Sequence, residues 1–174
     1  TFHSLNFADD DIPTTSVRSL FTDSDNNIWM GIGTYGLACL EYATGKLKSH
    51  SQMPEFTGMT IPTVFSVVQR KGSGEIWFGT DGGIFAYHKG QRVRNLTPEN
   101  CKFLGSSCVS ALYEDKYANC WVGTRGSLGV QLADGNSFLF ENMSFVDGAQ
   151  LNWFYVRDII ADSDNSMWIA TSNY

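Results

Sequence analysis

The stretch Glu75-Ile76-Trp77-Phe78-Gly79-Thr80 is one of four near-copies of a short pattern, and their spacing decides the fold. The tryptophans recur every 44 to 48 residues, each inside an apolar segment. Repeats of about 40–50 residues that hold several short strands are typical of β-propeller blades. The four copies are centred on Trp29, Trp77, Trp121 and Trp168.

Each copy predicts four antiparallel strands. A first apolar segment begins twelve residues before the Trp, and Asp, Ser, Asn or Gly residues separate it from the Trp segment, as in a β-hairpin. A Gly-rich turn then leads to a third strand, and a more polar fourth strand closes the unit at 46–51, 92–96 and 137–141. The first segments begin at Val17, Phe65, Val109 and Val156.

The strand count predicts an all-β propeller segment with three complete blades at about 13–52, 60–97 and 105–141. A fourth blade begins at 153–174, and residues 1–12 are expected to form the outer strand of a preceding blade. Because the fourth blade is incomplete, these four blades do not close a ring, and we expect them to form an arc of a larger ring. Repeat arrays rely on neighbours for burial, and the chain alone should be marginally stable or self-associating.

Small residues share a strand face with the tryptophans, because side chains alternate along a strand. We expect the missing side chain to make room for a large residue of the adjoining blade. The spacing also predicts that the tryptophans pack in the core and do not form a sugar platform. The glycines in question are Gly31, Gly79 and Gly123.

An Asp stands six residues before the Trp in three copies, and Lys71 stands there in the second. We interpret these carboxylates as acceptors for backbone N–H groups of the hairpin and not as paired catalytic acids. The turns faintly resemble Ca²⁺ loops but lack the Gly and the distal Glu. We therefore expect no metal and no cofactor. The three residues are Asp23, Asp115 and Asp162.

Composition excludes several classes of function. The net charge of −6 argues against nonspecific binding to nucleic acid or anionic lipid, so we expect contact with neither nucleic acid nor membrane. No apolar run reaches the roughly 18–20 residues of a membrane span. Signatures of nucleophilic or metal-dependent enzymes are absent, so no catalytic residue is expected.

The four cysteines divide into two pairs by context. Cys39 and Cys120 fall inside predicted strands and are interpreted as buried small apolar groups. Cys101 and Cys108 flank a short loop, and their spacing allows a disulfide in an oxidising compartment without establishing one.

The pattern Val-x-x-Leu-x-x-Asp-x-x-x-x-Ile-Trp-x-Gly, with the lead-in Asp10-Asp11-Ile12-Pro13, resembles the two-component regulator propeller repeats. Such repeats occur in the periplasmic sensor domain of hybrid two-component histidine kinases of Bacteroidetes. The resemblance covers almost the whole chain. Copy one departs from it at Ile32 and copy four at Ala170.

This resemblance implies a sensor and not an enzyme. It implies a periplasmic ectodomain of an inner-membrane protein, an oligosaccharide ligand and a homodimer of the parent sensor. The kinase and other output domains would lie outside these 174 residues. Two alternatives stay open. One is a carbohydrate-active propeller enzyme, which a buried carboxylate cluster in the channel would favour, and the other is a protein-interaction propeller.

Ligands of propellers usually bind at one mouth of the central channel. Aromatic faces beside carboxylate, amide and guanidinium groups suit sugars. Arg125 is the best single candidate, because a charged residue beside Gly126 has no evident core role. For Asp81 we prefer a role in stabilising its turn, and Trp153 is as well suited to packing between blades. The candidate ligand-binding residues are Tyr35, Asp81, Arg125, Asn152, Trp153, Asn173 and Tyr174.

Overall fold

The computed structural model describes residues 12, 16–141, 143–144, 150–151 and 154–173. It contains three four-stranded antiparallel sheets, each with its strands in chain order, and a two-stranded sheet that begins a fourth blade. The all-β propeller fold is therefore confirmed. Blade 1 consists of β1 (Val17–Thr22), β2 (Ile28–Ile32), β3 (Gly36–Leu40) and β4 (Leu47–Ser49); blade 2 of β5 (Val64–Gln69), β6 (Ile76–Thr80), β7 (Gly83–Tyr87) and β8 (Arg94–Leu96); blade 3 of β9 (Val109–Glu114), β10 (Cys120–Thr124), β11 (Leu128–Gln131) and β12 (Ser137–Phe140); blade 4 of β15 (Phe154–Ala161) and β16 (Met167–Asn173).

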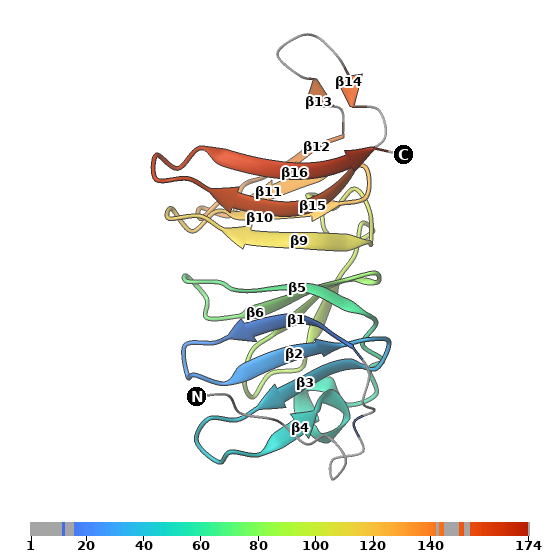
Figure 1. The fold of residues 1–174 in the computed structure, drawn as a ribbon, viewed down its shortest axis with the longest axis vertical. Coiled ribbons are helices and arrows are strands. Elements are labelled where there is room, and N and C mark those ends of the chain that lie inside the picture. Colours follow the sequence, from blue (N-terminus) through green and yellow to red (C-terminus); the bar gives the residue numbers. More distant parts are fainter. Residues whose placement is uncertain (1–11, 13–15, 142, 145–149, 152–153, 174) are drawn as a thin grey trace.

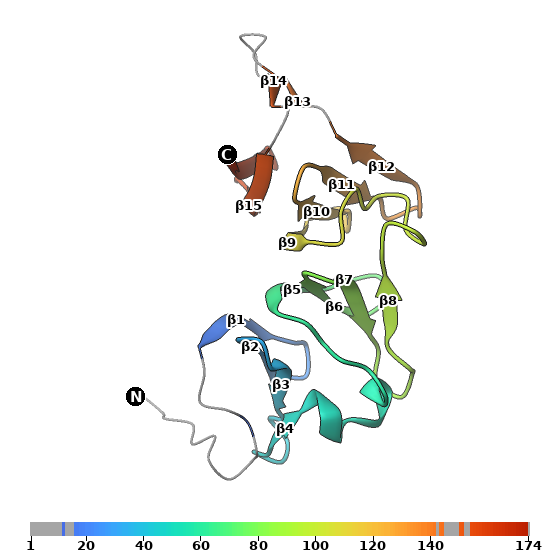
Figure 2. The same cartoon turned by 90° about the vertical axis from the view of Figure 1, so that its right-hand side faces the viewer.

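The blades follow one another along an arc (Figure 1). Figure 2 shows the first strands β1, β5, β9 and β15 on the inner side of this arc and the fourth strands on the outer side. Neighbouring first strands contact each other, so adjacent blades meet along the inner side of the arc. Because strands alternate in direction, the turns between the second and third strands all lie at one edge of the arc, and the first hairpin turns lie at the opposite edge.

The first hairpins are held by the expected Asp residues. Asp23 accepts backbone N–H groups of Asp25 and Asn27 through Oδ1, at 2.9 and 2.8 Å. Its Oδ2 also accepts the indole Nε1–H of Trp29 at 2.8 Å. Asp115 and Asp162 make the same bonds to their own turns and tryptophans. The backbone role is confirmed, and the bond to the Trp six residues later is a feature that the sequence did not reveal.

Blade 2 departs from this arrangement because its first hairpin is one residue longer. Gln69 pairs with Ile76, whereas Thr22 pairs with Ile28 in blade 1. The position equivalent to Asp23 is therefore occupied by Arg70. Its backbone N–H donates to the carbonyl oxygen of Glu75 at 2.8 Å and so closes the turn. The expectation that Lys71 holds this position is wrong for this reason, since counting back from the Trp ignores the inserted residue.

The same insertion changes which residue begins the second blade. The register of each first strand shifts by one residue just after its first position, which is the signature of a β-bulge. In blade 2 this first position is Val64, and Phe65 is the bulged residue. Phe65 is therefore not the equivalent of Val109 and Val156. The equivalent first positions are Val17, Val64, Val109 and Val156.

These first-position valines explain the glycines of the Trp strands. A Cβ added to Gly79 would lie 2.9 Å from Cγ1 and 3.1 Å from the carbonyl oxygen of Val109 in the next blade. Gly31 faces Val64 and Gly123 faces Val156 in the same way. The expectation that the glycines make room for the adjoining blade is confirmed, although the incoming residue is a Val of moderate size. We call this Gly–Val contact the blade interlock.

The apolar core lies between the blades. One cluster joins blades 1 and 2 around Trp29 and Phe78, and another joins blades 2 and 3 around Trp77 and Val109. Trp29 and Trp77 are buried as expected, and Trp121 is half-buried. Trp168 is 62% exposed, because no third strand or following blade covers it among the described residues.

Three further details differ from or extend the sequence analysis. The fourth strand of blade 1 ends at Ser49, and the 3₁₀ turns η1 (His50–Gln52) and η2 (Pro54–Phe56) follow it. The connection between β12 and β15 contains the short strands β13 (Met143–Ser144) and β14 (Gln150–Leu151). The strand expected within residues 1–12 falls almost entirely outside the described residues.

The cysteine side chains are all free thiols. Cys39 and Cys120 are buried within strands, as expected, and burial raises the pKa of each thiol to about 12. Cys101 is buried between blades 2 and 3, whereas Cys108 Sγ lies 3.1 Å from the Tyr155 hydroxyl in blade 4. The two residues that flank the loop therefore have different surroundings and are not bonded.

Candidate functional site

The candidate residues from blades 1, 2 and 3 lie at the same edge of the arc, in the turns between second and third strands (Figure 1). Tyr35 comes from the β2–β3 turn, Asp81 from the β6–β7 turn and Arg125 from the β10–β11 turn. Among the described residues, no hydrogen bond or ion pair joins these three side chains to one another. We call this edge the loop edge. It corresponds to the channel mouth expected from the sequence.

Arg125 is exposed and sits where blades 3 and 4 meet. Its backbone N–H donates to the carbonyl oxygen of Cys108 at 3.2 Å, and its backbone forms an isolated bridge with Tyr155. The backbone of Arg125 is thus fixed on two sides while its guanidinium reaches solvent. This is a suitable arrangement for presenting a bidentate donor to a ligand.

Tyr155, on the first strand of blade 4, lies beside Arg125, and Arg157 of the same strand stacks on the Tyr155 ring. The guanidinium carbon of Arg157 lies 4.3 Å from the centre of the Tyr155 ring, and Arg157 Nε donates to Ser172 Oγ at 2.9 Å. Burial and the neighbouring Cys108 raise the pKa of Tyr155 to about 12, so its hydroxyl stays protonated at neutral pH. Arg157 is not among the candidates predicted from the sequence, although its place next to the first-position Val marks it as the bulged residue.

Tyr35 has a structural role as well as a place at the loop edge. It packs against the apolar cluster around Met30 and Ile32 and makes an edge contact with His50, with ring centres 5.9 Å apart. Burial lowers the pKa of His50, which keeps this imidazole neutral at pH 7. Tyr35 is half-buried, so only part of its ring is open to a ligand.

Asp81 is exposed, and among the described residues its side chain accepts no hydrogen bond. The turn is held instead by Thr80, whose Oγ1 accepts the N–H of Gly82 and donates to the carbonyl oxygen of Gly83, both at 2.9 Å. The turn-stabilising role that we preferred for Asp81 belongs to Thr80. A buried Thr hydroxyl can both donate and accept, which an ionised carboxylate cannot do.

The remaining candidates come from blade 4 and the connection before it. Asn152, Trp153 and Tyr174 lie outside the described residues. The backbone of Asn173 pairs with Phe154 at the loop-edge end of β16. The described part of the site is therefore centred on Arg125, Tyr155 and Arg157.

Buried carboxylates in the described part of the chain all have structural partners. Asp23 and Asp115 hold hairpins, and Glu114 accepts hydrogen bonds from Arg70 Nε and the Lys71 backbone N–H, at 2.7 and 2.8 Å. No group of three His, Cys, Asp or Glu side chains gathers as a metal site among the described residues. No described helix is long and apolar enough to cross a membrane.

The fold and its repeats define a β-propeller repeat protein. The family model for the two component regulator propeller matches residues 11–34 and 152–173, which contain parts of the first and fourth copies. The resemblance found in the sequence is confirmed over these two segments. No curated protein matches the chain.

Solved structures share the fold at low sequence identity. The extracellular domain of the hybrid two-component system BT3049 from B. thetaiotaomicron superposes with a TM-score of 0.72 at 15% identity, over 97% of this chain and 22% of that one. That of BT4673 from the same organism gives 0.70 at 19%, over 95% and 21%. A streptogramin B lyase gives 0.61 at 17%, over 91% and 49%. The chain thus spans about a fifth of the two extracellular domains.

Proposed function

We propose that this chain is part of the ligand-sensing extracytoplasmic propeller of a hybrid two-component sensor. The observation that carries the proposal is the match of two segments to the two-component regulator propeller family. The likeness of the fold to extracellular domains of hybrid two-component systems supports it. In this proposal the propeller detects an oligosaccharide in the periplasm and the parent protein signals across the membrane.

The loop edge supplies the chemistry that such a ligand needs. A sugar presents apolar C–H faces and pairs of hydroxyls, which an aromatic ring and a guanidinium can contact together. Arg125 and Tyr155 lie side by side where blades 3 and 4 meet, and Arg157 stacks on the same ring. We place the oligosaccharide against this group, with Asp81 of blade 2 as a more distant polar contact.

The parent protein is proposed to act as a homodimer, in which ligand binding changes the arrangement of two ectodomains. The kinase and response-regulator domains are proposed to lie outside this chain. Differential affinity for two arrangements is what allows a ligand to shift a conformational equilibrium.

The two alternatives predict other features. A carbohydrate-active enzyme needs a pair of carboxylates that face a substrate, and the buried carboxylates described above instead hold hairpins or pair with Arg70. The likeness to a streptogramin B lyase concerns the fold, which hosts unrelated activities. A protein-interaction propeller would need a flat apolar loop edge, whereas Asp81 and Arg125 are charged and exposed.

The test is calorimetric titration of the protein with a panel of plant and host oligosaccharides. We expect saturable heat with one glycan class and an affinity at least about tenfold weaker in Arg125→Ala, since a hydrogen bond from a charged donor contributes about 1.5–3 kcal/mol. Arg92→Ala, an exposed Arg on the outer side of blade 2, is the matched control and should bind normally. Silence across the panel with intact folding would favour a protein partner.

A further inference from the structure

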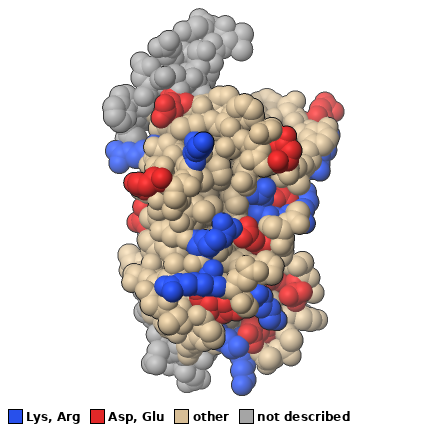
Figure 3. All heavy atoms as spheres, turned by 180° about the vertical axis from the view of Figure 1, so that it is seen from behind, with Lys and Arg blue, Asp and Glu red and all other residues tan. Residues whose placement is uncertain are grey.

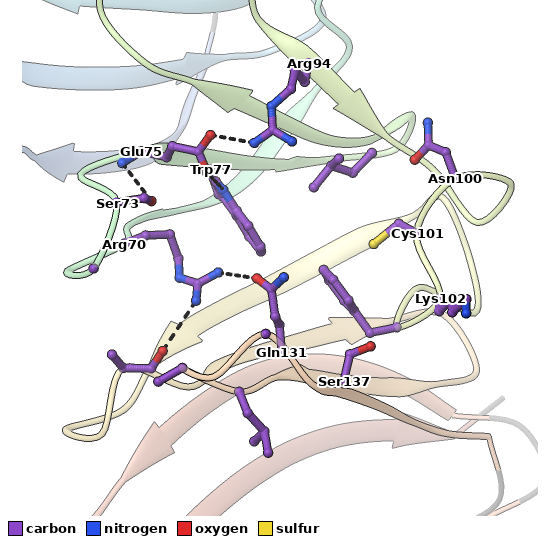
Figure 4. Close-up of a pocket in the computed structure, with 17 residues that line it drawn as sticks. Arg70, Ser73, Glu75, Trp77, Arg94, Asn100, Cys101, Lys102, Gln131 and Ser137 are labelled. Atoms are coloured by element: carbon purple, nitrogen blue, oxygen red, sulfur yellow. Dashed lines mark hydrogen bonds and ion pairs between the residues drawn. The ribbon is translucent and has the colours of Figure 1, made fainter.

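A second concave site lies between blades 2 and 3, on the outer side of the arc, and reaches the edge formed by the first hairpins. It is a groove of about 720 Å³, within the range of small-molecule sites. Blade 2 contributes its first hairpin and β8, the connection between β8 and β9 contributes residues 100–103, and blade 3 contributes the turn between β11 and β12 (Figure 4). The residues that decide its chemistry are Arg70, Glu75, Trp77, Arg94, Lys102 and Gln131.

Three cations and one carboxylate line this groove, in a chain whose net charge is −6. Arg70 is paired with Glu114 and Arg94 with Glu75, so Lys102 is the lining cation that has no ion pair among the described residues. The equivalent groove between blades 1 and 2 has the opposite balance, with Asp23, Asp25 and Glu41 against Lys89. The difference begins at the hairpin of blade 2, where Arg70 takes the place of the hairpin Asp. Over the back of the molecule, basic side chains gather around the middle with acidic ones between them (Figure 3).

The acceptors of the groove are already used by the protein. Glu75 accepts from Arg94 through Oε1 and from Trp77 Nε1 at 3.2 Å through Oε2, and these partners outweigh its burial and keep the pKa of Glu75 below its usual value. Gln131 Oε1 accepts from Arg70 at 2.7 Å. A ligand that donates hydrogen bonds would therefore find few free acceptors in this groove.

Donors, by contrast, remain available. Figure 4 shows the amide nitrogen of Gln131 directed away from Arg70, and the described residues offer it no acceptor. Lys102 is exposed and makes no ion pair within the described part of the chain. Arg94 is 58% exposed at its side chain and uses one of its five N–H groups on Glu75. An excess of donors and positive charge selects an acceptor-only anionic group.

The floor of the groove is apolar but does not offer a stacking platform. One face of the Trp77 indole is covered by the Arg70 guanidinium at 4.4 Å, and the Phe103 ring lies parallel to it at 6.0 Å. Leu96 and Leu132 complete the apolar lining. This combination suits a small organic anion, whose carbon skeleton meets the floor while its oxygens meet the donors.

We propose that the groove between blades 2 and 3 binds a small organic anion through a carboxylate or phosphate group. Lys102 and Gln131 contact the anion directly, Arg94 contributes charge, and Arg70 holds Gln131 in place. This site goes beyond the proposed function, since its lining includes none of the residues against which we place the oligosaccharide and it does not depend on oligosaccharide binding.

The test follows the indole N–H signals of the protein by NMR during titration. Galacturonate and glucose 6-phosphate are the anionic probes, inorganic phosphate tests whether the charged group is enough, and glucose is the neutral probe. We expect one or more anions to shift the Trp77 signal saturably, with the Trp29 signal of blade 1 unmoved and glucose without effect. Binding should weaken as salt is raised.

Variants make the assignment specific. Lys102→Gln should weaken binding at least about tenfold, Lys102→Arg should retain it, and Gln131→Leu should weaken it without loss of charge. Lys46→Gln, which removes the same charge from an exposed turn of blade 1, should bind normally. The proposal is overturned if no anion shifts Trp77, or if Lys102→Gln and Gln131→Leu, both folded, bind as the unaltered protein does. Saturation by inorganic phosphate alone, undisturbed by Gln131→Leu, would also overturn it.

Discussion

Three described hairpins each place one Asp where it serves two purposes at once. The carboxylate of Asp23 accepts two backbone N–H groups of the turn and the indole N–H of the buried Trp29. A buried indole N–H without an acceptor would be costly, and so would the turn amides if they lost theirs. A single residue therefore fixes both the turn and the core tryptophan of its blade.

Replacement of this carboxylate should lower the free energy of unfolding, because several hydrogen bonds are lost at once. For Asp23→Ala we expect a loss of about 2–3 kcal/mol in the free energy of unfolding, because four donors lose their acceptor. Asp25→Ala, two residues further along the same turn and exposed, should change it by less than about 0.5 kcal/mol. Urea unfolding measures both, and equal effects would contradict the role of Asp23.

The equivalent carboxylate of blade 3, that of Asp115, predicts that the stability of the protein depends on pH. Burial alone would raise the pKa of Asp115, but hydrogen bonds from Asn119, Trp121 and Tyr117 outweigh it and lower the pKa below its usual value. The folded state therefore holds this proton less tightly than the unfolded state. Its stabilising effect is complete above the unfolded pKa and is lost as pH falls through the folded pKa.

Asp115→Asn should accordingly flatten the acid side of the stability profile. Below about pH 4, the usual pKa of an Asp, the free energy of unfolding should fall less steeply in the variant than in the unaltered protein. Urea unfolding at several pH values measures this slope. Parallel profiles for the two proteins would show that the Asp115 carboxylate does not contribute to the acid sensitivity.

At the scale of the strands, the blade interlock joins each blade to the next. The first-position Val enters the space left by a Gly in the preceding Trp strand, and Val64, Val109 and Val156 are fully buried there. Val17, which has no preceding blade among the described residues, is 41% exposed. The same residue type is thus buried or exposed according to whether a neighbouring blade is present.

Gly79→Val tests the interlock between blades 2 and 3. The added side chain would collide with Val109, and overpacking of this kind costs about 1–3 kcal/mol or more. Gly72→Val is the matched control, since a Cβ there meets nothing within 4 Å and the backbone is not in the left-handed region. We expect a large fall in the melting temperature for the first variant only. A neutral Gly79→Val would argue against the interlock.

At the scale of the whole molecule, the arc has two apolar ends. Leu20 of β1 is 69% exposed, and Ile160 and Trp168 of blade 4 are 55% and 62% exposed. These side chains lie on sheet faces that are covered in the inner blade pairs. Exposed sheet faces and edges of this kind favour association with further β-structure.

The 174-residue chain on its own should therefore self-associate. We expect its sedimentation coefficient to rise with concentration, and Ile160→Ser and Trp168→Ser to reduce this rise by making the end of blade 4 polar. Tyr42→Ser and Tyr117→Ser are controls, because these tyrosines are 71% and 63% exposed in hairpin turns. A concentration-independent coefficient would show that the ends of the arc do not associate.

The sequence by itself determined the repeat, the four-stranded blades and the burial of Trp29 and Trp77, because these depend on local alternation and spacing. It also led to the hairpin role of Asp23 and to the glycines of the interlock. Tertiary structure decided what depends on neighbours in space. The inserted residue that puts Arg70 in place of an Asp becomes visible only through strand register. The grouping of Arg125 with Tyr155, and the basic groove around Lys102, depend on how one blade packs against the next.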